Sequence, residues 1–134
     1  MTHAQCACGA LRLTSTAPPQ LTALCHCRAC QRRTGAPFSA NAFYAIGCVD
    51  ITGPATEFVR VAESGRRVRQ YFCPTCGSTL YWKADASPSW IGVAVGAFAD
   101  PAFPAPTLSV FEQSKHGWVQ LDGSMEHFSA LPAD

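Results

Sequence analysis

The sequence has no stretch of about 18 consecutive apolar residues, so it predicts no membrane-spanning helix. It also lacks an excess of charge of either sign, because ten Lys and Arg residues face nine Asp and Glu residues, for a formal net charge of +1. This near balance gives no electrostatic basis for nucleic-acid or membrane binding as a main function. A hydrophobic share of 48% and a charged share of 14% instead predict a compact globular protein with little solvated tail.

Several sequence signals are missing as well. A glycine-rich nucleotide-binding loop is absent, and there is no Gly-x-Ser-x-Gly motif, so a serine hydrolase has no support. The N-terminal residues lack the basic and then apolar regions of a signal peptide. We therefore expect a cytoplasmic protein in a reducing compartment, where persistent disulfides are rare. The eight cysteines then need another explanation, and metal binding is the usual one.

The chain of 134 residues is expected to form a single domain, residues 1–134. Short apolar runs separated by Gly, Pro and Ser favour strands over helices, so we predict a mainly β fold. The expected strands are Ala10–Ser15, Leu21–His26, Ser39–Ile46, Thr56–Ala62, Val68–Phe72, Thr79–Lys83, Trp90–Ala97 and Leu108–Glu112.

The segments between these strands carry turn and loop signals. Glu63-Ser64-Gly65-Arg66 is typical of a hairpin turn that joins two strands. The proline-rich segment 100–106 cannot continue a helix or a central strand and is predicted to be a loop. Residues 28–34 alone are expected to be helical, with Gly35 at the position that a helix C-terminus favours.

Seven of the eight cysteines fall into three groups. These groups are Cys6 with Cys8, Cys25 with Cys27 and Cys30, and Cys73 with Cys76. Thiolates are strong zinc ligands, and two cysteines two or three positions apart can reach one ion from a tight turn. Glycine follows the first and last groups, where a positive φ lets backbone N–H groups face sulfur. The groups therefore predict two zinc ions, of which the second can be only partly occupied.

Two of the groups together provide four ligands. Cys6, Cys8, Cys73 and Cys76 would form a structural Cys₄ site that ties the N-terminal strand to the middle of the chain. Spacing alone leaves alternatives open. Buried core thiols are one, and a different pairing, with Cys6 and Cys8 joined to part of the central group, is another.

The remaining set of three gives the sequence its chemical interest. Cys25, Cys27 and Cys30 would leave one zinc position open, which distinguishes catalytic from structural sites. The alternative is a structural site closed by a fourth side chain. His26 is nearest in sequence, although strand alternation points it away from its neighbours. His116 and His127 are more distant candidates.

Residues outside the three cysteine groups have simpler expected roles. Cys48 stands alone in an apolar setting and is predicted to be a core thiol. One of the three arginines on the short helix could hold a substrate carboxylate, or all three could form a solvated face. Aromatic residues are expected mainly in the core, with pocket walls as the alternative. These arginines are Arg28, Arg32 and Arg33, and these aromatic residues are Phe38, Phe43, Tyr44, Trp82 and Trp90.

The cysteine groups and their neighbours resemble a known family. The segments that carry the resemblance are Cys6-x-Cys8-Gly9, Cys25-His26-Cys27-x-x-Cys30 with Thr34-Gly35-Ala36-Pro37-Phe38, and Phe72-Cys73-x-x-Cys76-Gly77-Ser78. Later segments, 95–101 and 114–118, are similar too. The family is that of the glutathione-dependent formaldehyde-activating enzymes, which includes centromere protein V-like proteins.

The resemblance implies an Mss4-like fold of several coiled antiparallel β-sheets with little helix, stabilised by zinc. It assigns Cys6, Cys8, Cys73 and Cys76 to the structural zinc, and Cys25, Cys27 and Cys30 to the catalytic zinc. It further implies a carbon–sulfur lyase that resembles S-(hydroxymethyl)glutathione synthase and joins a small thiol such as glutathione to a small aldehyde such as formaldehyde. Arg32 or Arg33 would then bind a glutathione carboxylate.

Two functional hypotheses follow from these patterns. The first is a zinc-dependent enzyme that forms an adduct between a thiol and an aldehyde at an open Cys₃ zinc. The alternative is a non-catalytic, zinc-stabilised binding module of the same fold. Nucleic-acid binding is a weaker form of that alternative because the net charge is only +1.

Overall fold

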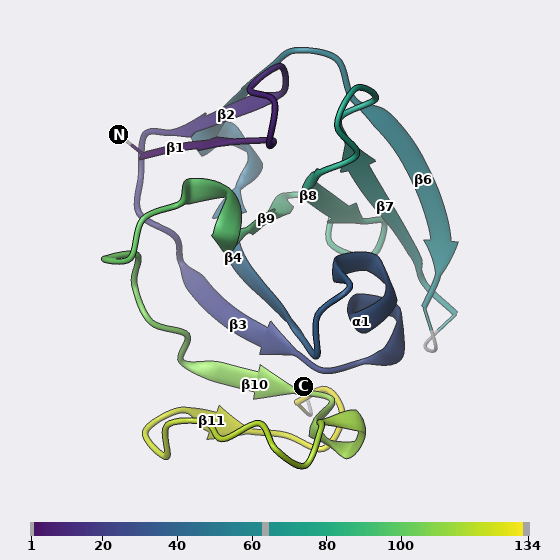
Figure 1. The fold of residues 1–134 in the computed structure, drawn as a ribbon, viewed down its shortest axis with the longest axis vertical. Helices are drawn as coiled ribbons and strands as arrows, with labels where there is room; N and C mark the ends of the chain where they lie inside the picture. Colours follow the sequence, from purple (N-terminus) through teal and green to yellow (C-terminus); the bar gives the residue numbers. More distant parts are fainter. Residues whose placement is uncertain (1, 63–64, 133–134) are drawn as a thin grey trace.

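The computed structural model describes residues 2–62 and 65–132. In this part of the chain, eleven strands form two sheets, with one α-helix and three short 3₁₀-helices (Figure 1). The strands are β1 (Thr2–Gln5), β2 (Arg12–Ser15), β3 (Leu21–Cys25), β4 (Ser39–Ala45), β5 (Val49–Thr52), β6 (Thr56–Val61), β7 (Arg67–Phe72), β8 (Thr79–Ala84), β9 (Trp90–Ala94), β10 (Leu108–Val110) and β11 (Glu126–His127). The helices are α1 (Arg28–Thr34), η1 (Ile46–Cys48), η2 (Val95–Phe98) and η3 (Glu112–Ser114).

The smaller sheet has the order β1-β2-β5, and its strands are antiparallel. The larger sheet has the order β11-β10-β3-β4-β9-β8-β7-β6. Its central strands are antiparallel, but β10 pairs in parallel with both β3 and β11. The expected antiparallel sheets are therefore present except at this edge, where the chain returns through the proline-rich loop before it enters β10.

The prediction of a mainly β fold is confirmed, and each of the eight expected strands is present within a few residues. The expected helix is confirmed from Arg28 to Thr34, with Gly35 in the left-handed conformation at φ 69°. Strands β1, β5 and β11 were missed. Of the expected hairpin turn, Glu63 and Ser64 lie outside the described residues, while β6 and β7 on either side pair antiparallel.

The main core lies where the two sheets pack together. Leu11 and Leu13 from the small-sheet region meet Tyr44, Leu80 and Ile91 from the large sheet, and all five are almost fully buried. Cys6 and Cys73 belong to the same buried cluster. The first candidate metal ligands are therefore built into the contact between the sheets.

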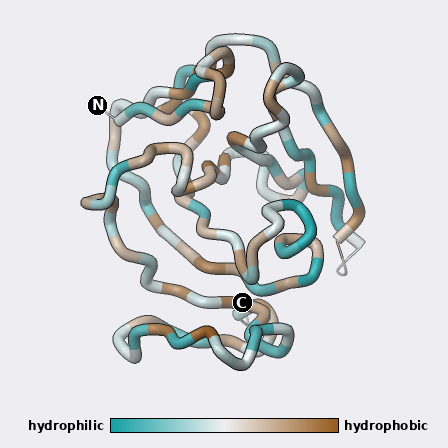
Figure 2. Tube along the Cα trace, viewed as in Figure 1, coloured by the Kyte–Doolittle hydropathy of each residue, from teal (hydrophilic) through white to brown (hydrophobic). Residues whose placement is uncertain are grey.

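The larger sheet curves, so that α1 at the end of β3 faces strands β6 to β8 (Figure 1). Hydrophobic residues colour much of β3 and β10, whereas α1 is mostly hydrophilic (Figure 2). Only Cys30 is buried in this helix. The curvature therefore brings a polar helix and the concave side of a β-sheet to the same cavity.

No helix in the described segments is both long and apolar enough to cross a bilayer.

Candidate metal centres and the adjoining pocket

Four cysteine thiols lie together, two from the turn after β1 and two from the turn between β7 and β8. The sulfur atoms of Cys6, Cys8, Cys73 and Cys76 all lie within 4.8 Å of one another. Cys8 Sγ is 3.6 Å from both Cys6 Sγ and Cys73 Sγ. A tetrahedral zinc ion with Zn–S bonds of about 2.3 Å requires sulfur–sulfur separations of about 3.8 Å. The donor type, the number of donors and their spacing thus fit one metal ion.

Two similar turns present these sulfur atoms. In the first turn Gly9 N–H donates to Cys6 O, and in the second Gly77 N–H donates to Cys73 O. Both glycines have a positive φ, 80° and 79°, a conformation that costs little only without a Cβ. Leu11 N–H also donates to Cys6 Sγ at 3.3 Å. Such donors stabilise a negatively charged sulfur, so the turns suit thiolate ligands.

The second cluster lies at the junction of β3 and α1. Cys25 ends β3, Cys27 is the N-cap of α1, and Cys30 lies in its first turn. Their three sulfur atoms are within 4.8 Å of one another. Cys30 N–H donates to Cys27 Sγ at 3.3 Å, which shows the helix start and the cluster to be one local structure. The described residues therefore contain two cysteine clusters that could each hold a metal ion.

The histidines considered as a fourth ligand are engaged elsewhere. His26 is fully buried and its Nε2 lies 3.0 Å from Oγ of Ser109 in β10. His116 Nε2 is 2.9 Å from Gln31 Oε1, and His127 Nδ1 is 2.6 Å from Glu112 Oε2. Within residues 2–62 and 65–132, no Asp, Glu or His joins the three sulfur atoms. This part of the chain leaves the fourth position of a tetrahedral ion open.

The crowding of the thiols affects their proton affinity. Hydrogen bonds from Cys25 and Cys27 lower the pKa of Cys30, and Arg33 contributes through its charge. The pKa of Cys25 is raised because Cys25 donates to Cys27 and Cys30 and is partly buried. At the four-cysteine cluster, the hydrogen bond with Ser78 lowers the pKa of Cys76 to about 5. Each cluster thus stabilises negative charge on one of its sulfur atoms, Cys30 or Cys76, in the form that binds metal, whereas the pKa values of Cys8 and Cys25 are raised.

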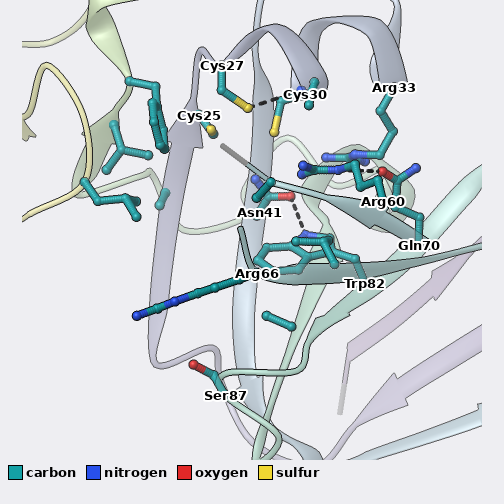
Figure 3. A pocket seen from close by; sticks show the side chains of 18 of the residues that line it. Cys25, Cys27, Cys30, Arg33, Asn41, Arg60, Arg66, Gln70, Trp82 and Ser87 are labelled. Carbon is teal, nitrogen blue, oxygen red and sulfur yellow. Dashed lines mark hydrogen bonds between the residues drawn. The ribbon is translucent and has the colours of Figure 1, made fainter. Parts of the chain in front are cut away.

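A cavity of about 370 Å³ opens beside the three-cysteine cluster. Figure 3 shows the three sulfur atoms at one end of the cavity and Ser87 at the other. Arg33 and Arg60 lie close to each other, near the end that holds the sulfur atoms. Arg66 also lines the cavity, and none of these arginines forms an ion pair within the segments described. Arg60 Nε donates to Gln70 Oε1 at 2.9 Å. The cavity is cationic and contains no acidic lining residue among those described.

The arginines proposed from the sequence separate in the structure. Arg33 lines the cavity, whereas Arg28 and Arg32 are exposed and are not among its lining residues. Sequence reasoning missed Arg60 and Arg66, which come from β6 and from the approach to β7. In the sequence, Arg60 could have been noticed because it interrupts the apolar segment 58–62 of the expected strand. Arg66 has no such signal. Only the curvature of the sheet brings them opposite α1.

A chain of hydrogen bonds joins the wall of the cavity to the cluster. Trp82 Nε1 donates to Asn41 Oδ1 at 3.0 Å, which orients the amide so that Asn41 Nδ2 donates to Ser39 Oγ at 2.9 Å. The Ser39 hydroxyl is then free to donate to Cys30, and it lowers the pKa of that thiol. Gln31 supports the same loop by donating to His26 O at 2.8 Å and Ser114 O at 3.1 Å.

Two expectations about the core need correction. Cys48 is only partly buried, because it ends η1, a short 3₁₀ turn that connects β4 to β5 and has no buried residue. Among the aromatic residues, Tyr44 is a core residue, but Phe43 and Trp82 line the cavity and Trp90 is 36% exposed. Their alternation with buried neighbours places them on the concave face of the sheet instead of in the core between the sheets.

Comparison with known proteins places this geometry in context. The sequence model described as "glutathione-dependent formaldehyde-activating enzyme" matches residues 1–114. A crystal structure of a Rhodobacter sphaeroides protein from structural genomics has a similar fold, with a TM-score of 0.61 and 19% sequence identity. The similarity covers 81% of this chain and 99% of the other. A comparison with curated proteins finds no significant match.

Proposed function

This chain belongs to the glutathione-dependent formaldehyde-activating enzyme family, and from that premise we propose that it is a zinc-dependent enzyme of the carbon–sulfur lyase type. Its reaction would join a small thiol such as glutathione to a small aldehyde such as formaldehyde. The observation that carries the proposal is the position of Cys25, Cys27 and Cys30 at one end of a cationic cavity. A purely structural metal site has no need of such a cavity.

The proposed roles of the cysteines follow from their clusters. Cys6, Cys8, Cys73 and Cys76 would hold a structural zinc ion, since all four positions are filled by sulfur and two of the residues lie in the core. Cys25, Cys27 and Cys30 would hold the catalytic zinc. Zinc with an open position can bind a thiol cosubstrate, lower its pKa and keep it as the nucleophilic thiolate.

The protein's own residues would then bind and orient the substrates. Arg33, Arg60 and Arg66 provide guanidinium groups that can bind the carboxylates of a thiol such as glutathione. In the reaction, sulfur bonds to the aldehyde carbon, the C=O double bond becomes a single bond, and its oxygen takes up a proton. Arg33 is near enough to Cys30 to affect the thiol's pKa, so its N–H groups are candidates to stabilise that oxygen.

The same proposal covers the domain and its surroundings. Residues 1–134 would act as one zinc-binding domain, since the four-cysteine cluster joins the two sheets, and the three-cysteine cluster and the cavity lie on the larger one. A reducing compartment such as the cytoplasm would suit the chain, because seven of its eight cysteines lie in the two clusters that would bind metal as thiolates. The cavity has no feature that calls for a nucleic acid as partner, and small molecules fit its size.

The test is to measure formation and breakdown of the adduct in solution. Exchange spectroscopy of ¹³C-formaldehyde with glutathione, in the presence of zinc-loaded protein, should show faster interconversion than buffer alone. Cys27→Ser should remove the acceleration, and Cys48→Ser should retain it because Cys48 belongs to neither cluster. A fully metal-loaded protein that neither accelerates the exchange nor binds glutathione would contradict the proposal and favour the binding-module alternative.

A further inference from the structure

A second pocket of about 370 Å³ lies next to the cationic cavity. The two share four lining residues: Phe43, Trp82, Ala84 and Ser87. We propose that this second pocket binds a hydrophobic substituent of the aldehyde, so that the substrate class is an anionic thiol together with an aryl or alkyl aldehyde larger than formaldehyde. The assignment to the aldehyde rests on the proposed function, whereas the apolar binding site does not.

The two pockets differ in charge, although apolar atoms form most of the lining surface of both. The cavity beside the sulfur atoms contains three arginines, but the second pocket has no charged residue among its described lining. Its additional residues are Gln20, Leu21, Trp90 and Gly92. A molecule that spans both would need an anionic part and an apolar part. Formaldehyde has only two non-hydrogen atoms and no apolar group to place there.

Exposed apolar side chains mark the second pocket. Leu21 is 37% exposed and Trp90 is 36% exposed, and both line it. Large apolar side chains that face water around a concavity are typical of a ligand site, because the ligand then removes their surface from water. Trp90 and Leu21 come from β9 and β3, two strands that flank β4. Phe43 of β4 lies between them and belongs to both pockets.

The wall between the pockets is held in place. The ring of Trp82 meets that of Phe43 edge to face, with centroids 5.4 Å apart and an interplanar angle of 89°. Its N–H is fixed by buried Asn41 at 3.0 Å. The other side of the indole packs on Gly92, where a side chain has no room. A fixed aromatic wall is preorganised and loses little side-chain entropy when a ligand binds.

The proposed reaction is compatible with a substituent in this pocket. The new bond forms between the thiol sulfur and the carbonyl carbon, and the proton released by the thiol ends on the former carbonyl oxygen. The second substituent of that carbon takes no part in bond making or breaking. It can therefore extend away from the sulfur cluster, past Trp82, and determine which aldehyde is accepted.

The test uses two stable thioethers as probes of zinc-loaded, full-length protein: S-methylglutathione and S-hexylglutathione. Isothermal titration should give at least about tenfold tighter binding of the hexyl compound, since a fully buried methylene contributes about fourfold in affinity. Trp90→Ala should reduce this ratio to about twofold or less, because an aromatic wall of the pocket is lost. Leu21→Ala is a second variant that should reduce it.

Trp118→Ala is the matched control, since Trp118 is 71% exposed and lines neither pocket. It should keep the full ratio. Equal affinities of the two thioethers, no binding of either, or an unchanged ratio in both pocket variants would overturn the inference. Failure of the proposed function is distinguishable: the formaldehyde exchange would then be absent while the binding ratio persists. Conversely, active protein without a hexyl preference would refute only the second pocket.

Discussion

Gly92 and Trp82 face each other across β9 and β8 so closely that a Cβ atom on Gly92 would lie 2.6 Å from Nε1 and 2.7 Å from Cζ2 of the indole. Real Cβ atoms do not approach other atoms to such distances. The missing side chain of Gly92 is therefore what allows Trp82 to lie flat on the sheet, where it separates the two pockets and donates to Asn41.

The first prediction concerns this contact. Gly92→Ala should displace Trp82 and lower the free energy of unfolding by about 1–3 kcal/mol, the usual effect of overpacking. It should also weaken thioether binding in both pockets. Gly96→Ala is the matched control because a Cβ at Gly96 meets open space. Urea titrations followed by tryptophan fluorescence would measure both, and equal stabilities of the two variants would contradict the structural reading.

The second prediction separates the two cysteine clusters. Cys73→Ser should lower the Tm by about 10 °C or more, because a structural metal ion contributes several kcal/mol to folding and each kcal/mol moves the Tm by several degrees. Cys27→Ser should cost activity with a smaller loss of stability, because Cys27 is the half-buried N-cap of α1 and lies outside the core cluster. Thermal melts with zinc analysis test this division. Equally depressed melting temperatures would refute it.

The third prediction uses neighbouring arginines on one helix. Arg33→Ala should raise the KM for a thiol with carboxylates by about 10- to 100-fold, since a hydrogen bond to a charged group contributes about 1.5–3 kcal/mol. Arg32→Ala should have little effect, because Arg32 is exposed and does not line the cavity. Arg60→Ala should raise the KM in the same way, whereas Arg33→Ala should also lower kcat, because the Arg33 N–H groups are the proposed donors to the aldehyde oxygen. Steady-state kinetics with glutathione test this, and a larger effect at Arg32 than at Arg33 would overturn the assignment.

The fourth prediction concerns alkaline pH. Burial and the hydrogen bond to Glu57 raise the pKa of Tyr71 to about 12 from the ordinary tyrosine value of 10.0. Between these values the unfolded chain releases the phenol proton while the folded chain retains it, so stability should fall as pH rises through this interval. Tyr71→Phe should show a shallower decline in the urea midpoint between pH 10 and 12. Identical slopes in the two proteins would contradict the linkage.

The sequence was informative wherever one local signal decides the structure. Strand β7 alternates along its length, and α1 has Gly35 to end it, so both were predicted within a residue or two. The grouping of the cysteines into four and three also followed from counting ligands, and the sulfur positions agree with that grouping. Strand β1, Thr2–Gln5, lacks apolar alternation, and it forms because it pairs with β2.

The cavity could not be predicted from sequence in the same way. Arg60 and Arg66 lie more than 25 positions from Arg33, and only the curvature of the sheet brings them together. The spacing of Trp82 was compatible with the core or with a pocket wall, and the core was the expectation. Which face of a strand becomes core depends on what packs there, and here the concave face carries the pocket instead of a second sheet. Parallel pairing of β10 likewise depends on the path of a proline-rich loop.

The wide separation of the first cluster along the chain also bears on the order of events during synthesis. Cys8 and Cys73, in contact through sulfur, are 65 residues apart. At about 5–20 residues per second, the ribosome needs roughly 3–13 s to add that length. Until then the first pair of thiols has no partner pair with which to close a four-sulfur site. A nascent chain therefore exposes these thiols to oxidants, and a metal ion can be enclosed by this four-sulfur cluster only after the middle of the chain has emerged.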